Sequence, residues 1–206
     1  MPRLAHRLLF VAVLALTGLA GAAATSQESD LVSLKGQLLV AAPEMRDPNF
    51  TGTVVYLLEH DHRGAMGLVI NRLLAEGPIG ELLHGLERDE PVPDLERPIR
   101  VFEGGPVGRD QVFVLHSDDA QYPDTKTVAH GIAVTPSTAM LRDLAAGRGP
   151  RQSLLVIGYA GWAPGQLERE LGQGAWIVVE GDRKLVFDPD VTAKWDSAFA
   201  RRGIDL

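Results

Sequence analysis

The chain contains no cysteine, and this absence removes several kinds of chemistry. Disulfide scaffolds, thiolate metal sites and cysteine nucleophiles are all excluded. The sequence also lacks the GxGxxG and GxxxxGKS/T loops of nucleotide-binding proteins, the GxSxG turn of serine hydrolases and the HExxH helix of zinc peptidases. We therefore lean against an enzyme, and we expect no catalytic set, no metal and no cofactor.

Basic residues are also scarce, with 20 Lys and Arg against 27 Asp and Glu. Removing residues 1–24 takes away Arg3 and Arg7 and no acid, which leaves 18 basic residues against 27 acidic ones and a net charge of −9. A surface of this sign repels phosphates at long range. The charge argues against nucleic acid as a partner.

The N-terminus has the three regions of a secretory signal peptide in their usual order. Residues 1–7 are basic, residues 8–19 are nearly all apolar, and residues 21–24 are small. We predict cleavage after Ala24, a flexible leader over 25–33, a folded domain over 34–206, and a periplasmic or otherwise exported protein. The apolar run is short for a membrane span, so we expect no transmembrane anchor after cleavage, although an uncleaved anchor is the alternative.

Hydrophobic patterning predicts many short strands with helices placed irregularly among them. Residues 53–58 and 65–70 read as a hairpin with a long polar loop, and Asp182-Arg183 reads as a second hairpin tip. The other strands are predicted at 37–42, 99–102, 111–116, 132–134, 153–157 and 176–179, and the helices at 78–86, from Thr135, at 164–171 and after Asp190. Strands and helices do not alternate, which favours a single α+β domain with a mixed or largely antiparallel sheet and about four helices.

The glycine-rich segment, Gly158–Leu171, is the most distinctive stretch of the chain. It follows an apolar run and places Tyr159 and Trp162 among glycines, where backbone can approach a ligand or another element closely. We predict a hard turn after the strand and then a short helix carrying Gln166 and Glu168. Glu168 and Glu170 could face a pocket; the alternative interpretation is that these acids complement the dipole at the start of the helix.

Two other clusters could carry chemistry. The run Glu59-His60-Asp61-His62 has the composition of a zinc or nickel site, and a solvated hairpin loop is the competing interpretation. His116 lies beside Ser117 and Asp118, but neighbours on a strand point to opposite faces and do not form a triad. Gly104-Gly105-Pro106 reads as a tight turn between two strands.

Several motifs resemble the YqgE/AlgH family in order and spacing. They are Leu34-x-Gly36, Ala41-Ala42-Pro43, Val54-Val55-Tyr56-x-x-Glu59-His60, Gly64–Asn71, Gly104–Val107, Phe113–His116 and Gly158–Glu170. The resemblance covers the chain from about Leu34 to Asp205. It implies one α+β domain whose bifurcated sheet forms a pseudo-barrel, and no established activity, although members are often described as transcriptional regulators. Many members have a cysteine where this chain has Leu58, so thiol chemistry at that position is absent here.

These observations lead to one preferred hypothesis and two alternatives. We expect a non-catalytic exported protein that binds a protein partner or small ligand through a groove lined by Glu59, His60, Asn71, Gly104, Gly105, His116, Tyr159, Trp162, Gln166 and Glu168. One alternative is a cytoplasmic, transcription-linked regulator whose start codon is assigned too far upstream. The other is a metal-assisted hydrolase that uses Glu59, His60 and His62.

Overall fold

The computed structural model describes residues 32–81, 96–136 and 139–203 of the chain. All of them belong to one compact unit, Leu31–Leu206. The predicted signal peptide, most of the predicted leader and most of the helix predicted at 78–86 lie outside the described residues.

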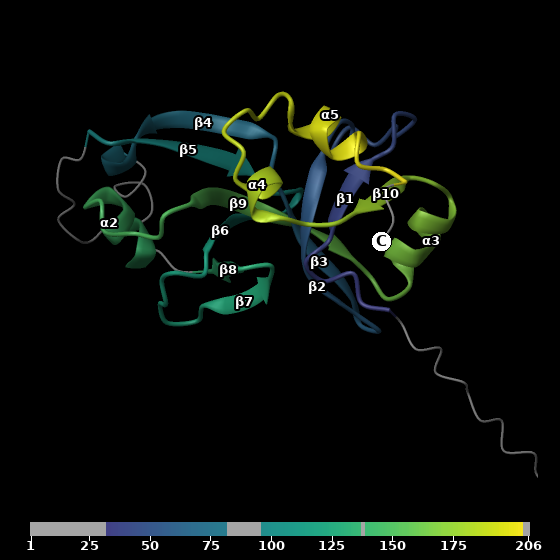
Figure 1. Ribbon diagram of the computed structural model, residues 1–206, viewed down its shortest axis with the longest axis horizontal. Coiled ribbons are helices and arrows are strands. Elements are labelled where there is room, and N and C mark those ends of the chain that lie inside the picture. Colours follow the sequence, from purple (N-terminus) through teal and green to yellow (C-terminus); the bar gives the residue numbers. More distant parts are fainter. Residues whose placement is uncertain (1–31, 82–95, 137–138, 204–206) are drawn as a thin grey trace, which may run out of the picture. The chain divides into compact units, whose positions relative to one another are not determined.

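Ten strands of the described residues form one sheet, and four helices accompany them (Figure 1). The strands are β1 (Leu38–Ala41), β2 (Val54–Asp61), β3 (Gly64–Val69), β4 (Leu73–Pro78), β5 (Pro98–Glu103), β6 (Val107–Ser117), β7 (Lys126–Ala129), β8 (Ile132–Thr135), β9 (Ser153–Trp162) and β10 (Trp176–Val179). The helices are α2 (Ala139–Ala145), α3 (Gln166–Gly172), α4 (Arg183–Val186) and α5 (Lys194–Phe199). The α+β class is confirmed.

Strand β9 is where the sheet divides. Along one side it pairs with β6, and along the other it pairs first with β5 and then with β3. The β5 pairing is parallel and covers Leu155–Ile157, whereas the β3 pairing is antiparallel and covers Ala160–Trp162. The sheet is therefore mixed and bifurcated. Its main path has the strand order β10-β1-β2-β3-β9-β6-β8-β7, and β4 and β5 branch off this path at β9.

Glycine is required at the branch because backbones meet there. Gly158 lies between the two pairing segments of β9 with φ 74°, a left-handed conformation that other residues rarely adopt. A Cβ on Gly104 would lie 2.2 Å from the Gly158 carbonyl oxygen, and one on Gly105 would lie 2.4 Å from the Tyr159 backbone. The close approach expected from these glycines is therefore to another strand.

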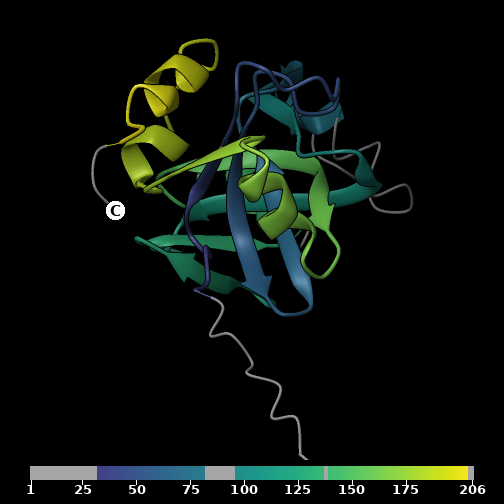
Figure 2. The same ribbon diagram turned by 90° about the vertical axis from the view of Figure 1, so that its right-hand side faces the viewer.

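The sheet curls but does not close into a barrel. Along the main path of the sheet β10 and β7 are the two end strands, and no pairing joins them within the described residues. Side chains bridge part of the gap instead, because Lys35 Nζ donates to Thr127 O at 3.3 Å and Tyr56 Oη donates to Ala129 O at 3.4 Å. We call this line of contacts between β7 and the β1–β2 side the seam. Figure 2 shows the strands of the unit curving round one another.

Three local predictions were wrong. The hard turn predicted from Gly158 is absent, because β9 runs through to Trp162 and the chain turns only over 163–165. The loop of the first hairpin is not long, since β2 continues to Asp61 and only two residues separate it from β3. The predicted hairpin at Asp182 is instead the start of α4, whose Leu185 N–H donates to Asp182 Oδ1 at 2.9 Å.

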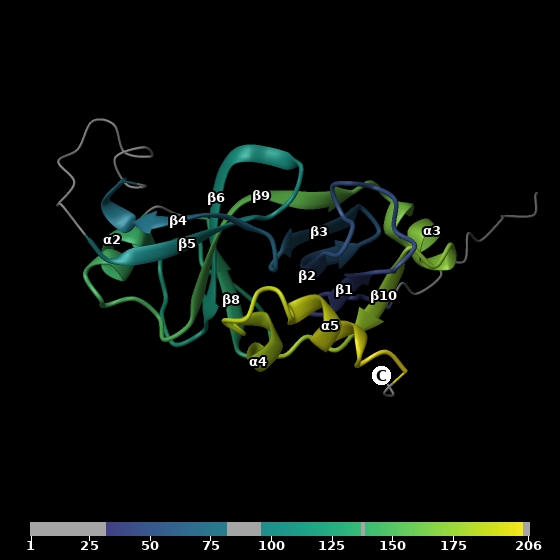
Figure 3. The same cartoon turned by 90° about the horizontal axis from the view of Figure 1, so that it is seen from above.

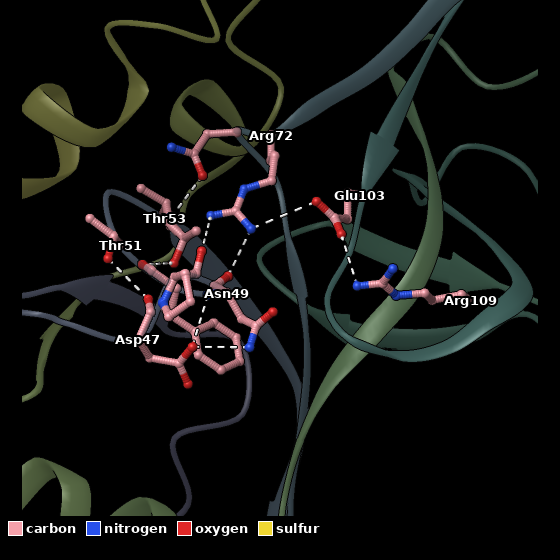
Figure 4. A network of polar contacts seen from close by, with 11 residues as sticks. Asp47, Asn49, Thr51, Thr53, Arg72, Glu103 and Arg109 are labelled. Atoms are coloured by element: carbon pink, nitrogen blue, oxygen red, sulfur yellow. Dashed lines mark hydrogen bonds and ion pairs between the residues drawn. The ribbon is translucent and has the colours of Figure 1, made fainter.

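A polar network fixes the loop between β1 and β2 to the branch region (Figure 4). Arg72 Nη1 donates to Asn49 O at 2.9 Å, and the same guanidinium lies 3.7 Å from the Glu103 carboxylate. Glu103 also lies 3.7 Å from Arg109. Asp47 Oδ1 accepts from the Asn49 backbone N–H at 2.8 Å, which holds the loop in a tight turn.

Helix α5 lies beside β1 and β10, and α4 packs against α5 (Figure 3). Trp195 Nε1 donates to Ala41 O at 2.9 Å, and the fully buried Lys194 donates from Nζ to Val186 O at 2.8 Å and to Ile70 O at 3.2 Å. A lysine so deeply buried is uncommon, because burial disfavours its charged form. These contacts tie the C-terminal helices to the start of the sheet.

Candidate ligand-binding site

A cavity of about 230 Å³ lies at the seam, and we call it the seam cavity. Its apolar lining comes from six strands of the sheet, β2, β3, β6, β7, β8 and β9, with one proline beyond β8: Leu58, Met66, Phe113, Val128, Val134, Pro136 and the ring of Tyr159. Phe113 and Tyr159 meet edge to face with ring centroids 6.2 Å apart. An apolar group can therefore be surrounded by the strands that the curled sheet brings together.

The polar lining of the seam cavity is small and carries two cations and one anion. It consists of Lys35, Glu59, Gln111, Lys126 and Thr127. Lys126 Nζ lies 3.1 Å from Glu59 Oε1, and the two side chains are 68% and 55% exposed. Two predicted site residues, Glu59 and Tyr159, thus meet here with residues that the sequence did not single out.

His60 lies on the opposite side of β2 from this cavity, and both of its ring nitrogens are hydrogen-bonded within the protein. It is buried, its Nδ1 accepts from the Leu34 backbone N–H at 2.9 Å, and its Nε2 lies 2.8 Å from Glu168 Oε1. With Nδ1 accepting, the proton of the neutral ring is on Nε2 and points at Glu168. Burial on its own would raise the pKa of Glu168, but hydrogen bonds from the Glu168 backbone N–H and from His60 lower that pKa below its ordinary value. Two of the predicted site residues, His60 and Glu168, thus contact each other, but both ring nitrogens of His60 are already used.

Trp162 and Gln166 belong to an aromatic cluster centred on a carboxylate. Glu170 Oε2 accepts from Trp162 Nε1 at 2.9 Å and from Trp176 Nε1 at 2.8 Å, and Glu170 Oε1 accepts from Gln166 Nε2 at 2.9 Å. Phe50 stacks on Trp162 with ring centroids 6.1 Å apart. Trp162 is only 5% exposed, so it anchors α3 to the sheet and does not stack a ligand.

Three more of the predicted site residues hold the backbone together. Asn71 Oδ1 accepts from Val54 N–H at 2.8 Å, and its Nδ2 donates to Gly52 O at 2.9 Å, which closes the entrance of the first hairpin. Gly104 and Gly105 form the branch contacts with β9 described above. None of the three lines the seam cavity.

His116 is fully buried and closes a directed chain of hydrogen bonds. Its Nδ1 donates to Ser117 O at 2.8 Å, so its Nε2 accepts from Thr135 Oγ1 at 2.9 Å. Thr125 Oγ1 lies 2.7 Å from Thr135 Oγ1, and Ser117 Oγ donates to Asp119 instead of to the imidazole. Burial lowers the pKa of His116, and the ring is neutral. A triad of His116, Ser117 and Asp118 is not formed.

The four residues of the Glu59–His62 run, for which a metal site was only the alternative interpretation, are dispersed along β2 and its turn. Glu59 pairs with Lys126, His60 with Glu168, and Asp61 with Arg63 at 2.7 Å, while His62 is exposed. Among the described residues, no group of three His, Asp or Glu side chains is arranged to hold a metal ion. The described residues at the seam combine an apolar lining with a few charged and polar groups.

Lys35, Gln111 and Lys126 are the site residues that sequence reasoning missed. They come from three separate parts of the chain and meet only because β6 and β7 curl back towards β1 and β2. Glu170 was equally hidden, although its spacing of four from Gln166 places the two side chains on one face of α3.

Comparisons with known proteins agree with this fold. The sequence profile of a family described as AlgH-like (DUF179) matches residues 38–206. A UPF0301 protein of Methylococcus capsulatus is 40% identical over 171 residues, which cover 83% of this chain and 92% of that protein. A UPF0301 protein of Alcanivorax borkumensis is 42% identical over 173 residues, which cover 84% and 91%.

Solved structures show the same arrangement. The solution structure of AlgH from Pseudomonas aeruginosa matches with a TM-score of 0.73 and 41% identity, covering 87% of this chain and 94% of that one. A crystal structure of a Corynebacterium diphtheriae protein matches with a TM-score of 0.65 at 21% identity, over 82% of this chain and 87% of that chain, which is a likeness of fold. Within the described residues, no helix is both long and apolar enough to cross a membrane.

Proposed function

Since the chain belongs to the AlgH-like family, we propose that it is a non-catalytic protein that binds a small ligand, or an apolar side chain of a protein partner, in the seam cavity. The observation that carries this proposal is the cavity itself: about 230 Å³ with an apolar lining and a few polar groups at its rim. This combination of concave apolar surface and sparse polar groups is typical of binding sites.

The hydrogen bonding of the two buried histidines supports binding over catalysis. A general base needs a free lone pair within reach of a substrate. His60 and His116 each have both ring nitrogens engaged by protein groups, and neither lines the seam cavity. The strongest candidates for acid–base chemistry are thus used to hold strands and α3 in place.

The test uses N-phenyl-1-naphthylamine, a neutral dye whose fluorescence rises in apolar surroundings. Val128→Phe fills the seam cavity, whereas Val32→Phe makes the same change at a side chain that is 82% exposed and does not line it. We expect saturable dye binding by the wild type and by Val32→Phe, and at least a tenfold loss of affinity in Val128→Phe, since a filled pocket loses its contacts with the dye. Equal binding by all three proteins would refute the proposal.

We also propose that the protein acts outside the cytoplasm, as the signal-like order of residues 1–24 suggests. Mass spectrometry of the protein expressed in its own cells gives the mature N-terminus. A terminus at Thr25 is the expected result. A terminus near residue 31 in a cytoplasmic fraction would support the regulator with a misassigned start.

A further inference from the structure

The charges at the rim indicate which ligands the seam cavity accepts. We propose that it takes an anionic amphiphile, meaning an apolar group that carries one carboxylate or sulfonate, and that Glu59 is an internal competitor for the cation that such a ligand needs. This inference rests on the proposed function, because it assigns the chemistry of the same cavity.

The lining contains two cations and one anion. Lys35, Lys126 and Glu59 are its charged residues, and the other lining residues are apolar or neutral. Lys35 donates to the neutral carbonyl of Thr127, so its positive charge is not cancelled by that contact. Among the described residues, Lys126 forms its ion pair with Glu59, at 3.1 Å. The three charged side chains together carry one net positive charge, which a ligand with one negative charge would neutralise.

The Glu59–Lys126 pair is suited to being displaced. Both side chains are more than half exposed, and pairs of this kind hold together weakly because water and salt screen them. A ligand anion that approaches Lys126 replaces one weak contact with another that is backed by burial of the ligand's apolar part. Glu59 thereby sets specificity: it repels anions from the rim and competes for Lys126 until the apolar part of the ligand outweighs it.

Two dyes with the same skeleton separate charge from apolar contact. N-phenyl-1-naphthylamine is neutral, and 8-anilinonaphthalene-1-sulfonate is its sulfonate. The variants are Glu59→Gln and Lys126→Gln, with Lys126→Arg as the conservative change. The controls are Glu180→Gln and Lys184→Gln, which make the same charge changes at exposed side chains away from the cavity.

We expect Glu59→Gln to bind the sulfonate about threefold more tightly and Lys126→Gln about threefold more weakly, as the worth of an exposed pair predicts. Affinity for the neutral dye stays the same in both variants. Lys126→Arg binds the sulfonate dye as tightly as the wild type does. Added salt lowers the affinity for the sulfonate dye and leaves that for the neutral dye unchanged. If the two dyes respond alike, or if the control variants give the same changes, the assignment of Glu59 and Lys126 is wrong while the cavity stands. If neither dye binds the wild type, the proposed function itself fails, and this inference fails with it.

Discussion

Lys194 offers a sharp test of the energetics of the C-terminal helices. The side chain is 1% exposed, and its ammonium group is held by the carbonyl oxygens of Ile70 and Val186. Burial lowers the pKa of Lys194 from 10.5 to about 8, with Asp188 opposing this effect and Arg100 adding to it. The folded protein therefore holds a charged lysine at neutral pH at an energetic cost.

The sign and size of the effect follow from the two pKa values. Below pH 8 both folded and unfolded chains keep the proton, and between about 8 and 10.5 only the unfolded chain does. The free energy of unfolding therefore rises with pH across this window. The gap between 10.5 and about 8 corresponds to a gain of about 3 kcal/mol. A neutral amine still has two N–H groups, so both carbonyl oxygens remain hydrogen-bonded.

The measurement compares wild type with Lys194→Met by urea unfolding, followed by tryptophan fluorescence at pH 7, 8, 9, 10 and 10.5. Methionine keeps most of the volume and cannot titrate, so it removes both the charge that is costly at pH 7 and the donor to Ile70 O and Val186 O. We expect the unfolding free energy of the wild type relative to that of the variant to rise by about 3 kcal/mol from pH 7 to 10.5. Lys184→Met, at an exposed lysine of α4, should follow the wild type. A difference that stays flat over this range would refute the reasoning.

Two further predictions concern the buried histidine and the branch. Because burial lowers the pKa of His116, the unfolded chain takes up the proton first, and the free energy of unfolding should fall as pH drops below 6.5. In unfolding experiments from pH 7.5 to 5, His116→Gln should lose part of this pH dependence. A variant whose stability falls as steeply as that of the wild type would contradict the prediction. Gly104→Ala should destabilise the fold by about 3 kcal/mol or more, since its Cβ would meet the Gly158 carbonyl oxygen. Gly172→Ala, whose Cβ meets nothing within 4 Å, should be neutral or stabilising, and similar melting temperatures for the two variants would overturn this account of the branch.

Regular patterns in the sequence were enough to predict most strands and the class of fold. Apolar β-favouring runs identified β2, β3 and β10, and the motif resemblance pointed to a bifurcated sheet. Predictions from short apolar runs failed where the same composition is compatible with either a strand or a helix. The strand implied after the predicted hairpin tip at Asp182 is instead the helix α4, because its buried Leu185 and Val186 suit either conformation and Asp182 caps the helix.

The candidate site was harder to predict because it depends on contacts between distant parts of the chain. Glu59 and Lys126 are 67 residues apart, and Lys35 and Thr127 are 92 apart. Nothing in local periodicity encodes such pairs, since they follow from how far the sheet curls before β7 ends. Trp162 and His60 misled for the opposite reason: both residue types are common in binding sites, and here both are buried and hydrogen-bonded within the fold.

The most distinctive residues of the chain and the residues of the cavity therefore serve different ends. Gly104, Gly105 and Gly158 are required wherever one strand pairs with β3, β5 and β6 at once, so any sequence with this branched sheet needs small residues at those positions. Lys35, Glu59 and Lys126 carry no such backbone constraint, and their side chains can change without disturbing the sheet. It follows that ligand preference can diverge among proteins that share the glycine pattern. Under the proposed function, the charges at the seam, and not the glycine-rich segment, would set which ligand is bound.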